Sequence, residues 1–384
     1  MKTQLKSLGL ALSLGSMLSA CAPASSDLEV RDLPQGRVSK AGNVAAEVKH
    51  EPKVDILFVI DTSGSMGTHQ ENLEKNIDKF VEAFKQHAEV DFHIGAVSAW
   101  DSVRYGGAQP VVQAPMPIGK LRPVKNNGQP VAGPQFVTRS EGFEKILGGT
   151  LKLGIEPRMD DSGKDLGGPE YEELFSPILP ALGSQNEGFY RPDAHLAVVF
   201  ITDAEDATMG KTAKMVKSDL VALKGGKESL VSVHGALAFT CSQVDKSLID
   251  GETKKINRPV KLEELIEITK GKAVDLCGKD KEGKPTFGRK LGEIGRVIQE
   301  KTSAQDVKIS LSPSLPSPGT IVVTYNGQAL KQGRDWSYDA TYNRVEVHVD
   351  QPAIAKQPGG TIGVEFTPVD PTKLSKGRVI PVGS

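Results

Sequence analysis

The stretch that decides the fold is VDILFVIDTSGS at residues 54–65, where a nearly continuous apolar run ends abruptly in polar residues. A strand with so little polar alternation is typical of a parallel sheet that helices cover on both faces. Similar runs lie at 92–97, 196–201 and 231–239, and a segment with helical spacing of apolar residues, 68–87, follows the first of them. The sequence therefore predicts a doubly wound, mostly parallel α/β sheet.

Polar residues with ligand-type side chains directly follow the first of these strands. Asp61, Ser63 and Ser65 occupy alternate positions of a tight loop, and Gly64 lets the backbone fold closely around a shared centre. Asp203 follows another apolar run, and ligands of parallel sheets bind at the carboxyl ends of the strands. Neutral oxygen ligands with few carboxylates suit a hard cation such as Mg²⁺. A turn that caps the next helix is the alternative interpretation of the loop.

These residues resemble the metal-ion-dependent adhesion site of von Willebrand factor A domains, in which a D-x-S-x-S loop follows one apolar strand and an aspartate follows a later one. The resemblance covers roughly residues 51–305. It implies a von Willebrand factor A-like, Rossmann-type fold for this part of the chain. It also implies that Asp61, Ser63, Ser65 and Asp203 bind Mg²⁺, with Mn²⁺ or Ca²⁺ as alternatives.

In that family, a threonine from a second loop completes the site. Thr150 is the last residue of the sequence Gly-Gly-Thr at 148–150, which matches the Gly-Gly-Thr sequence often found in such loops. Residues 155–165 intervene here before the next helical segment, however, and they leave Ser162 as a rival for the same role. A plain turn at 148–150 is the third interpretation.

A site with few negative ligands leaves a bound cation electrophilic, so that it can accept a carboxylate from a partner. The resemblance therefore implies an adhesion-like protein of the cell envelope, facing the periplasm or the surface, that binds a protein or another macromolecular ligand. A structural envelope component, in which the motif only stiffens the fold, is the alternative. An enzyme is less expected, because Ser65 lacks the first glycine of a nucleophile elbow and the seven histidines have no zinc-ligand spacing. A net charge of -1 without a long basic run argues against nucleic acid as a partner.

Residues 1–20 have the features of an export signal. Lys2 and Lys6 provide a positively charged start, and a short apolar core follows at 8–18. The segment leads into Leu-Ser-Ala-Cys at 18–21, which resembles the lipobox of bacterial lipoproteins. That resemblance implies a lipoprotein signal peptide, with lipid, including palmitate, attached to the cysteine.

Lipidation would make Cys21 the mature N-terminus and the lipid the sole attachment to the membrane. Ala22, rather than an aspartate, follows it, which in that family favours the outer membrane. An ordinary secreted protein, with Cys21 incidental, is the alternative. Cys241 and Cys277 remain as an even pair in an oxidising compartment, so we predict a disulfide between them. Two buried free thiols are the alternative for that pair.

The remaining segments complete the predicted organisation. Residues 21–50 are polar, with scattered proline and glycine, and predict a flexible tether. Insertions in the α/β domain are expected near 101–140 and 242–259. Short alternating segments with an Asn-Gly turn predict a second, small antiparallel β domain at 306–370, followed by a tail at 371–384. The order of these segments is similar to that of bacterial lipoproteins that pair the two domain types.

Overall fold

The computed structural model describes residues 31–32, 37–38, 44–87, 90–106, 114, 116–133, 135–156, 168–239, 258–355 and 359–369. The predicted signal peptide, Cys21, Ser162, Cys241, most of the insertion near 242–259 and the tail at 371–384 lie outside these residues. Within them, no helix combines the length and the apolar character needed to cross a membrane.

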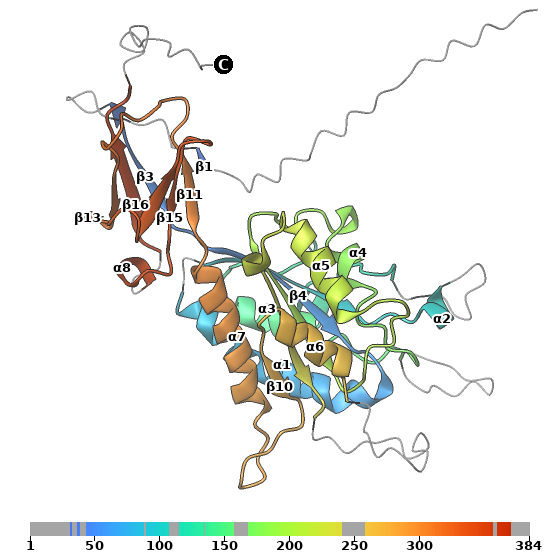
Figure 1. Cartoon of the computed structure of the whole chain (residues 1–384). Helices are drawn as coiled ribbons and strands as arrows, with labels where there is room; N and C mark the ends of the chain where they lie inside the picture. Colours follow the sequence, from blue (N-terminus) through green and yellow to red (C-terminus); the bar gives the residue numbers. More distant parts are fainter. Residues whose placement is uncertain are drawn as a thin grey trace, which may run out of the picture.

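The central sheet has five strands, and every neighbouring pair in it is parallel. In spatial order, the strands are β10 (Ala273–Asp275), β9 (Val231–Leu237), β8 (His195–Thr202), β4 (Lys53–Ile60) and β5 (Asp91–Ser98). Helices cover both faces of this sheet (Figure 1). The predicted fold class, a doubly wound and mostly parallel α/β sheet, is confirmed.

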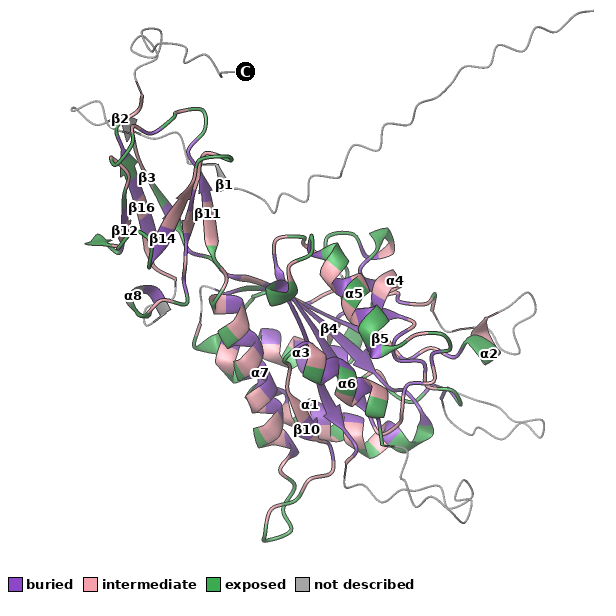
Figure 2. Ribbon diagram, in the orientation of Figure 1, coloured by how far each residue is buried: buried purple, intermediate pink, exposed green. Residues whose placement is uncertain are grey.

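The apolar run of β4 contributes to the core on both faces, because successive side chains of a strand point to opposite sides of the sheet. Phe58 and Ile60 lie in one core, Leu57 and Val59 lie in the other, and all four are fully buried (Figure 2). The helices of the first layer are α1 (Gly67–Lys85), α3 (Phe143–Leu151) and α7 (Phe287–Ser303). Those of the second layer are α4 (Ile178–Ala181), α5 (Ala213–Leu223) and α6 (Val260–Ile268).

Glycines on α7 let its backbone approach that of α1. A β-carbon at Gly295 would lie only 2.2 Å from the carbonyl oxygen of Phe80 on α1. A β-carbon at Gly288 would meet the Asn76 side-chain oxygen at 2.1 Å. Larger residues at these positions would push the two helices apart. Helix α1 follows the loop of Asp61 and Ser63 almost directly, so this packing also holds the end of that loop in place.

The chain path opens a crevice between β4 and β8. From β4 the chain crosses to β5 on one side, and it then continues to β8, β9 and β10 on the other side. The loops after β4 and β8 therefore leave the same edge of the sheet in opposite directions. Such a switch point is where doubly wound sheets bind their ligands.

A second domain consists of two small sheets (Figure 1). The first contains, in order, β1 (Arg31–Asp32), β11 (Val307–Ser310), β15 (Arg344–Val347) and β14 (Trp336–Asp339). The second contains β13 (Gln328–Ala329), β12 (Val322–Tyr325), β16 (Thr361–Phe366), β3 (Val44–Lys49) and β2 (Arg37–Val38). A short helix, α8 (Pro352–Ala355), precedes β16. All neighbouring pairs are antiparallel except β1 and β11.

The structure corrects the prediction that residues 21–50 form only a tether. Strand β3 pairs with β16 along its whole length, and Val48 lies opposite Ile362 with its side chain in the core of the β domain. The β domain is therefore not confined to 306–370. The short run VAAEVK at 44–49 alternates weakly, and its partner lies near the other end of the chain, so no local pattern identifies it as a strand.

The region predicted as an insertion near 101–140 covers the outer edge of β5. It contains the short helix α2 (Ser102–Tyr105) and a hairpin of β6 (Lys125–Asn126) and β7 (Gln129–Pro130). Val137 forms an antiparallel bridge with Ile94 on β5. This contact satisfies part of the backbone at an edge that would otherwise be open.

Candidate metal centre

Asp61 and Asp203 stand at the carboxyl ends of two neighbouring parallel strands. Asp61 directly follows β4, and its amide N–H donates a hydrogen bond to the carbonyl oxygen of Ile201 on β8 (3.0 Å). Asp203 directly follows β8. The two residues therefore flank the crevice at the switch point of the sheet.

The loop after β4 folds so that its hydroxyl groups meet the carboxylate of Asp203. The amide N–H of Ser63 donates to Asp61 Oδ1 (2.8 Å). The hydroxyl oxygens of Ser63 and Ser65 lie 3.1 Å apart, and Ser65 Oγ donates to Asp203 Oδ1 (3.0 Å). The structure thus brings together the four residues that the sequence singled out at the two strand ends.

Asp61 is fully buried beside a second carboxylate. Burial, followed by the charge of Asp203, raises the pKa of the Asp61 carboxyl group to about 6. Hydrogen bonds from Ser63 and from the Thr202 hydroxyl, which donates to Asp61 Oδ2 at 2.8 Å, lower this pKa but do not cancel the shift. A cation at this point would relieve the repulsion between the two carboxylates.

The donor set fits a hard divalent cation. Carboxylates and hydroxyls are the oxygen ligands that Mg²⁺, Mn²⁺ and Ca²⁺ prefer. The neighbouring Thr62 hydroxyl is buried and has no hydrogen-bond partner among the described residues. The same residues contain no group of three or more His, Cys, Asp and Glu side chains placed to hold a metal. Besides the carboxylates of Asp61 and Asp203, the candidate ligands in this part of the chain are the hydroxyls of Ser63 and Ser65.

The Thr150 hydroxyl makes structural hydrogen bonds, and its role as a metal ligand stays a prediction. Thr150 lies in the last turn of α3, where its hydroxyl donates to the carbonyl oxygen of Ile146 (2.7 Å) and accepts from the amide of Lys125 (3.0 Å). Within the described part of the chain, no hydrogen bond links it to the loop at 61–65. These contacts join α3 to the β6–β7 hairpin. The rival residue, Ser162, lies outside the described residues.

Glu172 is a third carboxylate near the centre, and the sequence did not single it out. Burial and the charges of Asp61, Asp203 and Asp101, in that order of size, raise the pKa of its carboxyl group to about 8. Glu172 lies in the stretch GGPEYEE at 167–173, where several glutamates stand close together and none has a distinguishing spacing. Only the fold brings this particular glutamate near Asp61.

The segment that contains Glu172 is held by two aspartates from other strand ends. Asp101, after β5, accepts hydrogen bonds from the backbone amides at 170–171 (3.0 and 3.3 Å). Asp206, after β8, is buried and accepts from the amides at 174–175 (2.8 and 3.0 Å). A carboxylate that accepts two backbone hydrogen bonds fixes the course of a loop. These aspartates therefore position the third carboxylate.

Gly168 brings the same segment against the loop of the metal centre. Its φ is +63°, and a β-carbon there would lie 2.2 Å from the Thr62 carbonyl oxygen and 2.4 Å from Ser63 Cα. Only glycine fits such a backbone approach. From the other side, Gln70 on α1 donates through Nε2 to the carbonyl oxygen of Asp61 (2.8 Å). The loop is thus supported on two sides before any ligand binds.

Cys277 is connected to this region through His69 on α1. Its Sγ atom lies 3.8 Å from His69 Nε2. Burial lowers the pKa of His69, and the charge of Asp203 acts in the opposite direction. Cys241 lies outside the described residues, so the disulfide between Cys241 and Cys277 stays a prediction.

No family model matches the chain, and no curated protein does. Among solved structures, it is similar to a von Willebrand factor type A protein from Catenulispora acidiphila, with 12% identity, a TM-score of 0.35, and 87% of this chain and 62% of that chain covered. The pilus adhesin SpaC from Lactobacillus rhamnosus GG has 11% identity and a TM-score of 0.34, with 84% and 40% covered. Proximal thread matrix protein 1 from the mussel byssus, with a zinc-occupied MIDAS motif, has 11% identity and a TM-score of 0.30, with 68% and 50% covered. The chain thus spans less than two thirds of each of these structures.

Proposed function

We propose that this protein binds a protein ligand through a divalent cation held by Asp61, Ser63, Ser65 and Asp203. The observation that supports the proposal most directly is the Ser65 hydroxyl, which lies 3.1 Å from that of Ser63 and donates to Asp203 at 3.0 Å. It joins oxygen ligands from two separate strand ends at one point. That point lies at the switch point of the sheet, where ligands of such folds bind.

When bound, the cation supplies an electrophilic centre that accepts a carboxylate oxygen from the ligand. The chain contributes few negative charges of its own. Asp61 and Asp203 provide the carboxylates, and the serines provide neutral oxygen atoms. A pKa of about 8 keeps Glu172 largely protonated at neutral pH in the absence of a cation. Because the chain supplies little negative charge, the bound cation could still attract one more carboxylate, which the protein ligand would supply.

Titration of the purified protein with Mg²⁺ and with Mn²⁺ in a calorimeter tests the metal site. We expect saturable binding to the wild type and none to Asp61→Asn or Asp203→Asn. Asp78→Asn is the matched control, because it removes the same charge from an exposed position on α1. Absence of heat with the wild type, or equal binding by Asp61→Asn, would contradict the proposal.

We propose further that the protein is exported and held at the outer membrane by lipid on Cys21. The support is the sequence of residues 1–21, with its charged start, apolar core and lipobox-like end. Mass measurement of the mature N-terminus tests the lipid. We expect a lipidated cysteine in the wild type and release of Cys21→Ser from the membrane fraction; an unmodified N-terminus at another residue would refute the anchor.

The second candidate is a structural envelope component. It is favoured by the direct hydrogen bonds between the two strand ends, such as that from Thr202 to Asp61 (2.8 Å). Capture of envelope proteins with and without chelator separates the two candidates. Ligand capture that is lost both in chelator and in Asp203→Asn supports the metal-dependent function, whereas capture that survives both supports the structural one. Lack of enzyme activity stays a prediction.

A further inference from the structure

A cavity of about 590 Å³ lies between the two domains, at the end of the central sheet opposite the metal centre. Both chain connections between the domains pass through its wall, at His50–Lys53 and at Ala304–Lys308. The volume is within the range of cavities that bind small molecules. The α/β domain and the β domain therefore share one site of sufficient size.

Most carboxylates on the wall of this cavity are already paired. The ion pairs are Asp193 with Lys53 (2.5 Å), Glu346 with Lys308 (3.0 Å) and Glu51 with Lys49 (3.2 Å), and Asp306 lies 3.0 Å from His348 Nδ1. By contrast, Lys227, Lys270 and Lys301 also line the cavity, and none of them forms an ion pair within the described part of the chain. The wall thus presents three ammonium groups whose charge no carboxylate neutralises at contact distance.

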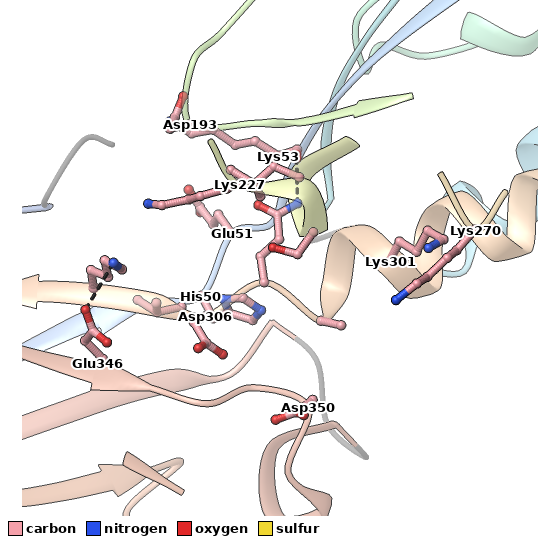
Figure 3. Close-up of a pocket in the computed structure, with 16 residues that line it drawn as sticks. His50, Glu51, Lys53, Asp193, Lys227, Lys270, Lys301, Asp306, Glu346 and Asp350 are labelled. Carbon is pink, nitrogen blue, oxygen red and sulfur yellow. Dashed lines mark hydrogen bonds and ion pairs between the residues drawn. The ribbon is translucent and has the colours of Figure 1, made fainter. Parts of the chain in front are cut away.

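These lysines lie at two ends of the cavity. Figure 3 shows the side chains of Lys270 and Lys301 next to each other at one end, and that of Lys227 at the other end, on the side of Glu346. Burial and the charge of Lys270 lower the pKa of Lys301. Burial and the charge of Lys308 likewise lower the pKa of Lys227, which Glu346 offsets only in part. Like charges are thus crowded at both ends, and a bound anion would relieve the repulsion.

We propose that the interdomain cavity binds an anion with two or more phosphate groups, one held by Lys270 and Lys301 and another by Lys227 and Lys308. Lysine is suited to phosphate as a compact point charge with three donors. Lys308 belongs to the β domain, and the other three lysines belong to the α/β domain. The bound anion therefore joins the two domains and fixes their relative position.

Binding of tripolyphosphate to the full chain, followed by calorimetry and by thermal unfolding, tests this proposal. The double variant Lys270→Gln/Lys301→Gln removes one end of the site. The matched control is Lys214→Gln/Lys281→Gln, which changes the same net charge at exposed positions outside the cavity. We expect binding by the wild type and the control, and at least about tenfold weaker binding by the double variant, because charge-assisted hydrogen bonds are lost.

The phosphate groups could belong to a soluble molecule or to a lipid headgroup. Phosphatidylcholine vesicles with and without diphosphatidylglycerol form the second arm of the experiment. Loss of tripolyphosphate binding in the double variant supports a soluble ligand, and loss of vesicle binding alone supports a headgroup. No binding of either probe by the wild type, or equal weakening in the double variant and the control, would overturn the proposal. Metal titration of the same variants is expected to be unchanged, so this result is independent of the metal centre.

Discussion

Replacement of Asp61 by asparagine should stabilise the metal-free protein while it abolishes metal binding. The Asp61 carboxylate is fully buried next to Asp203, so its ionised form is unfavourable when no cation is present. Asparagine has nearly the same shape and keeps an oxygen atom that can accept from the Ser63 amide. The change therefore removes the charge and leaves most of the packing.

The size of the effect follows from the pKa of Asp61, which rises from 3.8 to about 6 on folding. A shift of roughly two units, at about 1.4 kcal/mol each, corresponds to about 3 kcal/mol. The folded state binds the proton of the Asp61 carboxyl group more tightly than the unfolded state does. The stabilisation from this protonation is therefore complete below about pH 4 and is lost as the pH rises through about 6. Without metal, the free energy of unfolding of Asp61→Asn should therefore exceed that of the wild type by up to about 3 kcal/mol at pH 7.5. This difference should shrink towards pH 4.

Urea unfolding at pH 4.5, 6 and 7.5, in chelator and in Mg²⁺, measures both effects. At a Mg²⁺ concentration about 100 times the dissociation constant, the wild type should gain about 2.7 kcal/mol, and Asp61→Asn should gain nothing. Asp78→Asn, with an exposed carboxylate on α1, should behave as the wild type does. The reasoning fails if Asp61→Asn is less stable than the wild type in chelator at pH 7.5, or if both respond equally to Mg²⁺.

Three further experiments test separate parts of the structure. Thr150→Val should cost about 1–3 kcal/mol of unfolding free energy, because the amide of Lys125 loses its acceptor. Its Mg²⁺ affinity, measured by calorimetry, should be unchanged if Thr150 is not a ligand, whereas a large loss of affinity would support Thr150 as a ligand. Gly295→Ala should destabilise by about 1–3 kcal/mol in urea unfolding, since its β-carbon would lie 2.2 Å from the Phe80 carbonyl oxygen, whereas unchanged stability would show that α1 and α7 separate easily. Thiol titration of the denatured protein should detect two more thiols after reduction if Cys241 and Cys277 are paired, and an equal count would exclude the disulfide.

The candidate metal centre was predictable in part, because a short stretch of sequence identifies each of the two strand ends that form it. Asp61, Ser63 and Ser65 directly follow an apolar strand, and Asp203 directly follows another. Strands of a parallel sheet end at the same edge, so the two strand ends could be placed together without coordinates. The Gly-Gly-Thr sequence at 148–150 lies within α3, and the Thr150 hydroxyl donates to a carbonyl oxygen of that helix, which the sequence did not indicate.

No local sequence pattern identifies the other residues near the centre, Glu172 and Gly168. Glu172 stands among neighbouring glutamates, and only the carboxylates of Asp101 and Asp206, which hold its backbone from two other strand ends, bring it near Asp61. The need for glycine at 168 likewise follows only from the close approach of its backbone to the carbonyl oxygen of Thr62. Contacts of this kind join residues far apart in the chain, so no regular spacing in the sequence predicts them.

By itself, the sequence determined the class of the fold, the buried strands along the chain and the candidate oxygen ligands at two strand ends. These features are local, because burial on both faces of a sheet requires apolar runs and a strand end requires a turn. The tertiary structure alone decided that 44–49 completes the β domain, that Glu172 lies near Asp61, and that Lys227, Lys270 and Lys301 share an interdomain cavity. Each of these depends on which distant segments pack together, and the free energy of that packing is a property of the whole chain.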